Sequence, residues 1–277
     1  SLEVITLLFA YVCRSPNILL LRGNHEVYDM CSLYGFKQEI VNTYGSAKVF
    51  DYFIKAFDYL SFAAIIDETK FCVHGGISAE FTSIESLNKI QKPISVDDYK
   101  QNQLLRDLLW ADPSKQFPCF HESLRGDCCT FGSESIKQFL AKTKFTVLFR
   151  GHECCTNGVK SDFNSSVITV FSASSYKSNG SNKSGIIYVF KNENKMKIYS
   201  PLPRPNRNTS LLFQVRRPSK IPRTTSITLK LGNMGSPNLL KRKRNTIIKP
   251  LGLPKIFSVS SFSPFMLAND ENEEVVI

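Results

Sequence analysis

The 277-residue sequence lacks any uninterrupted run of about 18 apolar residues, the length that a membrane-spanning helix needs. Its most apolar opening stretch, Leu2 to Cys13, is interrupted by Glu3 and is too short to span a bilayer. The sequence also lacks Cys-x-x-Cys pairs, and its eight cysteines do not form the spaced framework of a small secreted domain. We therefore expect no membrane association and a reducing compartment, the cytoplasm, the nucleus or both.

The net charge of +11 is concentrated in the last part of the chain. Residues 1–199 carry 22 Lys and Arg against 20 Asp and Glu, a balance of +2, whereas residues 200–277 carry 13 against 4, a balance of +9. Few aromatic residues are interleaved with the charges of this second part, so its composition disfavours nucleic acid as a partner.

A domain boundary is predicted near Ser200. Nine of the thirteen prolines follow it, beginning with Pro201 and Pro203, and proline interrupts helices and central strands. We expect residues 1–199 to form the folded domain and residues 200–277 to be a basic, Pro/Ser-rich and mostly disordered tail. The Lys241–Arg244 run is compatible with a nuclear import signal and equally with a solvated basic segment.

Helical and strand-like hydrophobic periods alternate before the boundary, which predicts an α/β fold. Helices are expected over residues 2–12, 35–44, 46–60, 101–110 and 133–142, and strands over residues 17–22, 62–66, 70–73, 146–149, 167–171, 185–190 and 195–199. Ser46 and Ser133 are predicted as N-caps. Trp110 and Phe131 are expected in the core, and His121 in a solvated loop.

Three of the four histidines lie in glycine-containing turns directly after apolar strands. His25 follows Leu-Leu-Leu-Arg-Gly-Asn, His74 precedes Gly75–Gly76, and His152 follows Leu-Phe-Arg-Gly. Such strand ends are where α/β proteins place ligands and reactive groups. One such histidine would be an ordinary hydrogen-bonded residue, but three in the same context predict a functional site.

Six motifs in the order LLLRGNHE, HGGIS, LLWADP, RGDCCTFG, RGHE and VITVFSASSY resemble the serine/threonine phosphoprotein phosphatase (PPP) family of calcineurin-like metallophosphoesterases. The resemblance covers residues 1 to about 192. It implies an α/β fold with a four-layer β-sandwich flanked by helices, and a binuclear metal centre at the strand ends. It also implies hydrolysis of phosphoserine and phosphothreonine in proteins.

The resemblance also implies individual roles. Asn24, His74 and His152 match ligands of one of two divalent metal ions of the Mn, Fe or Zn class, for which amide and imidazole ligands are suitable. His25 matches the general acid that protonates the leaving oxygen. The remaining two assignments concern substrate: Arg125 matches the arginine that binds phosphate bidentately, and Tyr176 matches the aromatic residue that lines the phosphate cleft.

Two family motifs, Gly-Asp-x-His-Gly and Gly-Asp-x-Val-Asp-Arg-Gly, are absent from the sequence. The ligands of the other metal, the bridging aspartate, the aspartate that orients the general acid and one phosphate-binding arginine belong to them. We interpret the chain as an N-terminally incomplete phosphatase with one site lacking its ligands. The alternative is a catalytically dead module that binds or docks phosphoproteins.

Other departures of this sequence from the family pattern are smaller. Asp127 follows the Arg125 motif and is expected to weaken the hold of that arginine on phosphate. The vicinal pairs Cys128–Cys129 and Cys154–Cys155 are expected to be reduced thiols rather than zinc ligands. Phosphoprotein substrates and a regulatory subunit are the expected partners, and residues from about 205 onward are expected to be dispensable for catalysis.

Overall fold

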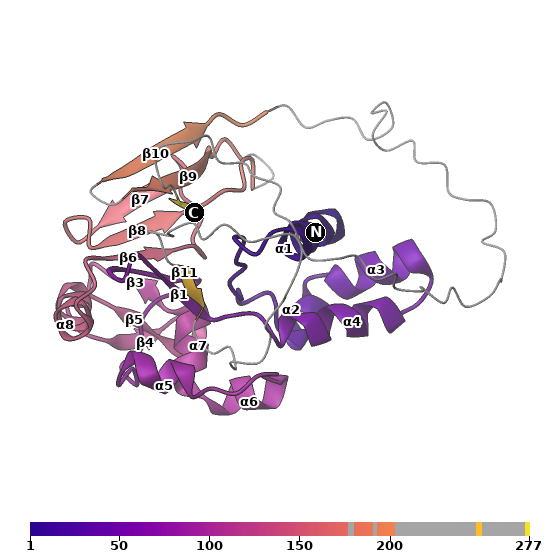
Figure 1. The fold of residues 1–277 in the computed structure, drawn as a ribbon, viewed down its shortest axis with the longest axis horizontal. Coiled ribbons are helices and arrows are strands. Elements are labelled where there is room, and N and C mark those ends of the chain that lie inside the picture. Colours follow the sequence, from indigo (N-terminus) through magenta and orange to yellow (C-terminus); the bar gives the residue numbers. More distant parts are fainter. Residues whose placement is uncertain (177–179, 191–192, 203–247, 251–274) are drawn as a thin grey trace, which may run out of the picture. The chain divides into compact units, whose positions relative to one another are not determined.

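The computed structural model describes residues 1–176, 180–190, 193–202, 248–250 and 275–277. Two units are separated along the chain, one containing Ser1–Pro201 with Thr246–Ile277 and the other Leu202–Asn245. The first unit contains the labelled helices and strands (Figure 1). In the described part of the chain, no helix is both long and apolar enough to cross a membrane.

A six-stranded mixed sheet lies at the centre, in the order β11-β1-β2-β6-β8-β7. Its strands are β1 (Ala63–Ile66), β2 (Lys70–Val73), β6 (Val147–Arg150), β7 (Val159–Asp162), β8 (Val167–Val170) and β11 (Ile248–Pro250). β2, β6 and β8 are parallel, whereas β1 and β7 flank them in antiparallel register. The ends of β2 and β6 therefore meet at one edge of the sheet.

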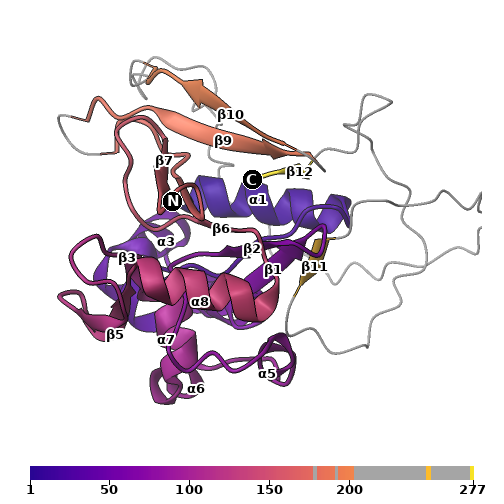
Figure 2. The same ribbon diagram turned by 90° about the vertical axis from the view of Figure 1, so that its left-hand side faces the viewer.

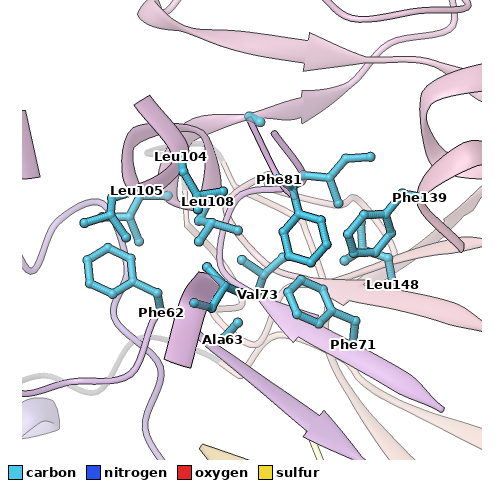
Figure 3. Close-up of a cluster of buried hydrophobic side chains, with 14 of the residues drawn as sticks. Phe62, Ala63, Phe71, Val73, Phe81, Leu104, Leu105, Leu108, Phe139 and Leu148 are labelled. Carbon is cyan, nitrogen blue, oxygen red and sulfur yellow. The ribbon is translucent and has the colours of Figure 1, made fainter. Parts of the chain in front are cut away.

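Both faces of this sheet are buried. Successive residues of a strand point to opposite sides, and all residues of β1, β2 and β6 are buried. One face contributes Ala63, Ile65, Phe71, Val73, Leu148 and Val167 to a core shared with helices α5 (Ile84–Asn88), α7 (Gln103–Trp110) and α8 (Ser133–Thr143). Figure 3 shows the rings of Phe71, Phe81 and Phe139 together in this core, with ring centroids 5.0–6.4 Å apart.

The opposite face packs against a second sheet of three strands in the order β10-β9-β12. These strands are β9 (Ser184–Val189), β10 (Asn194–Tyr199) and β12 (Val275–Val276). Ile187 and Val189 of β9 share a buried cluster with Ile66, Phe149 and Ile168 of the central sheet. The two sheets form a β-sandwich, and helices cover the face of the central sheet that points away from the second sheet (Figure 2). This arrangement confirms the predicted calcineurin-like fold.

A separate apolar cluster joins the first four helices. They are α1 (Leu2–Arg14), α2 (Tyr28–Leu33), α3 (Phe36–Tyr44) and α4 (Lys48–Phe57). Leu2, Ile40, Phe50 and Phe57 are buried between them. The cluster fixes the helices on both sides of the turn that carries Asn24 and His25.

A third sheet, in the order β3-β5-β4, was not predicted. It consists of β3 (Asp112–Pro113), β4 (His121–Ser123) and β5 (Gly126–Phe131), and the β4–β5 hairpin presents Arg125 at its turn. Its strands are short or mostly polar, so they carry little hydrophobic period. Helices α2, α5 and α6 (Val96–Gln101) and strand β7 were missed for the same reason.

The strand predicted over Asn17–Arg22 is wrong. This segment is extended, but only Leu21 forms a bridge, with Ser61, and Arg22 donates its backbone N–H to the Ser61 carbonyl at 2.7 Å. A strand requires a neighbouring extended segment along its length, and among the described residues the pairing is limited to this point. The residues before Arg22 are accordingly only partly buried.

Both predicted N-caps are displaced by one residue. Gly132 caps α8, so Ser133 is the first helical residue, and Ala47 caps α4. Ser46 still accepts the Lys48 N–H at 3.1 Å through its hydroxyl. The helix predicted over residues 101–110 begins two residues later as α7, because Asn102 adopts an extended conformation and its side chain caps α7 by accepting the Leu105 N–H at 3.2 Å; Gln101 is instead the last residue of α6.

Short segments of the predicted tail belong to the two sheets. Ile248–Pro250 pairs with β1, and Val275–Val276 pairs with β9. Ile277 exchanges two backbone hydrogen bonds with Ile187, at 2.8 and 2.9 Å, and packs on the cluster between the sheets. The Lys241–Arg244 run lies outside the described residues, and the boundary near Ser200 remains a prediction.

These pairings predict that removing the tail affects stability. Truncation after Arg204 removes the two hydrogen bonds between Ile277 and Ile187. Because each net hydrogen bond contributes about 1 kcal/mol, the free energy of unfolding should fall by roughly 2 kcal/mol. For a domain of this size that corresponds to a fall in Tm of about 4–8 °C. Replacing residues 206–244 by a Gly/Ser linker of equal length is the matched control and should leave Tm unchanged. Equal Tm values for both variants would contradict a structural role of β11 and β12.

Candidate active site

The parallel pairing of β2 and β6 brings His74 and His152 together. Val73 and Arg150 are opposite each other in register, so the residues that follow them leave the sheet at the same edge. The Gly151 N–H donates to the His74 carbonyl at 3.0 Å, and the two imidazole rings lie 5.1 Å apart between centroids at an angle of 70°. The predicted proximity of these two histidines is thus present.

Asn24 reaches the same edge from the turn between Arg22 and α2. Its side chain is 3% exposed, and its Oδ1 lies 2.8 Å from His74 Nε2. Gly23 permits this approach, because a Cβ there would lie 2.6 Å from Glu26 Oε2 and 3.1 Å from His74 Cε1. Gly75 has a corresponding role on the other side, since its Cβ would overlap the backbone of α7 at 2.5 Å.

His152 has two features of a ligand-binding residue. Its φ of 65° lies in the left-handed region, which is uncommon for a residue other than glycine and concentrates at functional sites. Its Nε2 is buried and has no hydrogen-bond partner among the residues that the structure describes. A buried polar atom without a partner is costly, so this nitrogen is suited to a group that binds there.

Burial lowers the pKa of His74 and of His152 to about 3. Neighbouring positive charge adds to this effect: for His74 it is mainly that of His152 and Arg150, and for His152 mainly that of Arg150 and Arg125. Both imidazoles are consequently neutral at pH 7, the state in which a ring nitrogen coordinates a metal. The described residues contain no cluster of three His, Cys, Asp or Glu that could hold a metal; here the third candidate is the amide of Asn24.

Arg125 is joined to the histidines through Asp112. Arg125 Nε donates to Asp112 Oδ2, and the other carboxylate oxygen of Asp112 lies 2.6 Å from Arg150 Nη2 and 3.9 Å from His152 Nε2. Neither terminal nitrogen of Arg125 has a partner among the residues that the structure describes. A planar guanidinium with two such nitrogens is suited to bidentate phosphate binding.

His25 is exposed beside Asn24, and its ring lies 5.0 Å from that of Tyr34 in an edge-to-face arrangement. Partial burial lowers its pKa. Within the described parts of the chain no carboxylate is hydrogen-bonded to the ring. His25 nevertheless lies close enough to His74 and His152 to lower the pKa of both.

The contacts described for Tyr176 do not reach the other five candidates. Its side chain is 61% exposed, and its ring meets Phe171 edge-to-face at 5.2 Å. Its backbone N–H donates to Asn182 Oδ1 at 2.9 Å, and Asn182 Nδ2 donates to the Ala173 carbonyl at 2.8 Å. Asn182 therefore closes the loop that presents Tyr176.

Sequence reasoning missed Asp112 and Arg150. Arg150 is buried and binds Gly75 O, Asp112 and Glu153, so it ties the His74 and His152 turns to the LLWADP segment. Both residues lie inside motifs that carried the family resemblance, and a charged residue at the end of an apolar strand was a usable signal. Such a charge needs a partner once it is buried, and Asp112 and Glu153 are the partners of Arg150.

Three secondary expectations have different outcomes. Phe131 is fully buried as expected, whereas Trp110 is only partly buried and its ring lies 5.6 Å from that of His152. Asp127 does not face Arg125, because its carboxylate pairs with Arg106 Nε at 3.1 Å. His121 is exposed, but it begins β4 and stacks on Phe117 at 3.7 Å.

The buried histidines predict a pH dependence of the metal-free protein. Unfolded histidine has a pKa of about 6.5, whereas His152 has a pKa of about 3 when folded. Below pH 6.5 the unfolded state therefore binds more protons, and stability falls as the pH is lowered toward 3. Urea midpoints at several pH values, in the presence of a chelator, should decline less steeply for His152→Gln than for the wild type. His121→Gln, which changes an exposed histidine, should keep the wild-type slope, and an unchanged slope for His152→Gln would contradict the assignment.

Comparisons with known proteins identify the family to which this chain is similar. The family model of the calcineurin-like phosphoesterases matches residues 1–156. A catalytic subunit of protein phosphatase 2A from Dictyostelium discoideum is 36% identical over 76% of this chain and 68% of its own length. The phosphatase 6 catalytic subunit of Caenorhabditis elegans is 35% identical over 75% and 62%, and the phosphatase 4 catalytic subunit of Saccharomyces cerevisiae is 38% identical over 64% and 56%.

A solved structure is also similar. It is a serine/threonine phosphatase of Saccharomyces cerevisiae described as similar to human phosphatase PP5, with a TM-score of 0.67 and 27% identity over 74% of this chain and 67% of that one. The chain thus spans about three fifths to two thirds of the length of these relatives. The chain belongs to the calcineurin-like phosphoesterase family, within its serine/threonine protein phosphatases.

Proposed function

We propose that this chain supplies the substrate-binding and acid-catalytic part of a phosphatase site that hydrolyses phosphoserine and phosphothreonine in proteins. The observation that carries the proposal is the convergence of Asn24, His74 and His152 at one sheet edge, with Arg125 joined to them through Asp112. The relatives are named as catalytic subunits of protein phosphatases, and no comparison favours a catalytically dead module.

The protein groups have distinct proposed roles. Arg125 binds two phosphate oxygens with its terminal nitrogens and compensates the charge that develops on them. His25 donates a proton to the departing Ser or Thr oxygen. Tyr176 forms part of the wall of the cleft beside Phe171. Asp112 keeps Arg125 oriented between substrates.

The family implies divalent metal ions, and the residues present fit one of them. The buried, unpartnered His152 Nε2, the neutral imidazole of His74 and the amide oxygen of Asn24 make a donor set suited to an ion of the Mn, Fe or Zn class. When bound, a pair of such ions would supply an activated water and charge compensation for an in-line displacement. Ligands of a second ion are absent with the two aspartate motifs.

A phosphate-release assay with Mn²⁺ and a phosphoserine peptide tests the function. The 277-residue chain alone should be nearly inactive, whereas a fusion carrying the two aspartate motifs of a relative before Ser1 should be active. Strong metal-dependent turnover by the unfused chain would contradict the need for a second ion. A folded but inactive fusion that binds the phosphopeptide would instead support the binding module.

The relatives suggest partners of the same kind. We propose phosphoproteins as substrates and a regulatory subunit as a further partner, because each relative is named as a catalytic subunit. A cytoplasmic or nuclear location remains a prediction from the sequence. Affinity purification of the fusion that carries the two aspartate motifs should recover a stoichiometric second subunit if the regulatory-partner proposal holds.

A further inference from the structure

Arg22 is fully buried, with 1% of its surface exposed, and it lies immediately before the turn that carries Asn24 and His25. Burial lowers its pKa, whereas Asp58 opposes this effect. An arginine remains charged in proteins, so the fold contains a buried cation. Removing such a charge from water costs several kcal/mol unless it is paired and fully hydrogen-bonded.

Each group of the Arg22 guanidinium reaches a different segment. Nε donates to the Glu26 carbonyl, Nη1 to the Ile94 carbonyl and Nη2 to Asp58 Oδ1, each at 3.0 Å. The guanidinium carbon also lies 5.5 Å from the centre of the Phe62 ring. The side chain thus joins its own turn to the end of α4 and to the segment before α6.

The same residue closes both ends of the metal-binding turn. The Arg22 N–H is fixed to the Ser61 carbonyl at 2.7 Å, and the Glu26 carbonyl is fixed to Arg22 Nε. Inside this closure, the Gly23 N–H donates to Glu26 Oε2 at 2.9 Å, and the Glu26 N–H donates to the Gly23 carbonyl at 3.1 Å. Asn24 and His25 are the two residues between these ties.

The anchors to which Arg22 binds are themselves connected. The Ile94 N–H donates to the Asp58 carbonyl at 3.0 Å, so the acceptors of Nη1 and Nη2 belong to one bonded unit. Lys92 strengthens the unit by donating to the Tyr59 carbonyl at 2.9 Å and to Ser61 Oγ at 3.1 Å. Arg22 is therefore held against a rigid support rather than a loose loop.

We infer that Arg22 is a positioning residue, which holds the Asn24–His25 turn at the orientation needed for metal binding and proton donation. The inference rests on the proposed function of that turn. A purely structural role does not require a cation, since a well-packed apolar pair in place of a buried ion pair is often neutral or stabilising. What an apolar pair cannot supply is the hydrogen bond to the Glu26 carbonyl, which fixes the turn.

The double variant Arg22→Met/Asp58→Leu separates positioning from stability. It removes the buried cation together with its partly buried carboxylate partner, so Tm should stay within a few degrees of the wild type. Metal affinity should fall by about 10–100-fold, the usual effect of losing a group that orients metal ligands. Co²⁺ is the probe, and its binding is followed by quenching of Trp110, the single tryptophan of the chain, which lies 5.6 Å from His152.

Asp107→Asn is the matched control. Asp107 is a buried carboxylate that accepts hydrogen bonds from Ser78, Gln103 and the Cys129 N–H, and none of its partners belongs to the turn. This variant should lower Tm and leave the Co²⁺ dissociation constant unchanged. If dissociation constants instead follow Tm across all variants, Arg22 acts only through stability and the inference is overturned.

Three further outcomes are decisive. If the double variant does not fold, Arg22→Lys keeps the charge with a single donor group, and it should bind Co²⁺ more weakly than the wild type at equal Tm; wild-type affinity would overturn the inference. Absence of Co²⁺ binding by the wild-type chain would overturn both the metal site and the role of Arg22. Wild-type binding with an equally tight double variant would leave the proposed function intact and reject only Arg22.

Discussion

Replacing His25 by alanine is expected to lower kcat for a phosphoserine peptide by about 10²–10⁴-fold in the active fusion, the usual contribution of a positioned general acid. The serine alkoxide is a poor leaving group and needs a proton as its bond to phosphorus breaks. The nitrophenolate of p-nitrophenyl phosphate needs much less protonation, so its kcat should fall less. Steady-state rates on both substrates, at saturating Mn²⁺, measure the difference.

His121→Ala is the control, because His121 is exposed and its ring stacks on that of Phe117. It should retain wild-type rates on both substrates. Partial burial lowers the pKa of His25. The acid form of His25 becomes scarcer as the pH rises through that pKa, and the wild-type rate on the peptide should decline with it. Equal losses on the two substrates in His25→Ala would remove the assignment of His25 as the acid.

The position of the site could be predicted from the sequence because it depends on short-range patterns. Val73 and Arg150 end apolar runs of the buried-strand kind, and glycine follows or precedes the adjacent histidines. Parallel strands then place their carboxyl ends at one edge, so His74 and His152 meet without any knowledge of the loops. The family resemblance added the roles of the individual side chains.

The remainder could not be predicted because it depends on contacts between distant segments. The β4–β5 hairpin that presents Arg125 has few apolar residues, and its position is set by pairing with β3. The run before Arg22 has the composition of a buried strand, yet it pairs only at Ser61. Composition likewise gave no indication that Ile277 would pair with Ile187, because a single edge strand contributes little to the character of a long segment.

Replacing Asp112 by alanine should be the most destabilising single change within the site. Arg150 is fully buried, and Asp112 Oδ1 accepts from its Nη2 at 2.6 Å. Removing one partner of a buried pair costs about 3–5 kcal/mol, because the other charge is left uncompensated. The lower end applies here, since Glu153 still accepts from Arg150 Nη1 at 2.6 Å. A loss of about 3 kcal/mol corresponds to a fall in Tm of roughly 6–12 °C.

Asp162→Ala is a matched control with a different expected result. Asp162 is more deeply buried than Asp112 and pairs with Lys115 at 3.1 Å and Lys160 at 2.9 Å, but both lysines extend into solvent. Water can therefore solvate these lysines once the carboxylate is gone, and the loss of stability should be clearly smaller. Similar losses for the two variants in calorimetry would show that burial of the aspartate, rather than of its cationic partner, determines the cost.

Arg125→Ala tests the other ion pair of Asp112, in which the carboxylate accepts a hydrogen bond from this exposed arginine. An exposed ion pair contributes only about 0–1 kcal/mol, so Tm should change little, while phosphate binding weakens and KM for the peptide rises. Asp112→Ala should combine this rise in KM with the loss of stability. It removes the carboxylate partner of Arg125 and at the same time leaves the buried charge of Arg150 without that partner. The two effects have separate origins in the two oxygens of one carboxylate: Oδ2 orients the arginine that we propose binds phosphate, and Oδ1 compensates the buried charge that joins the His74 and His152 turns.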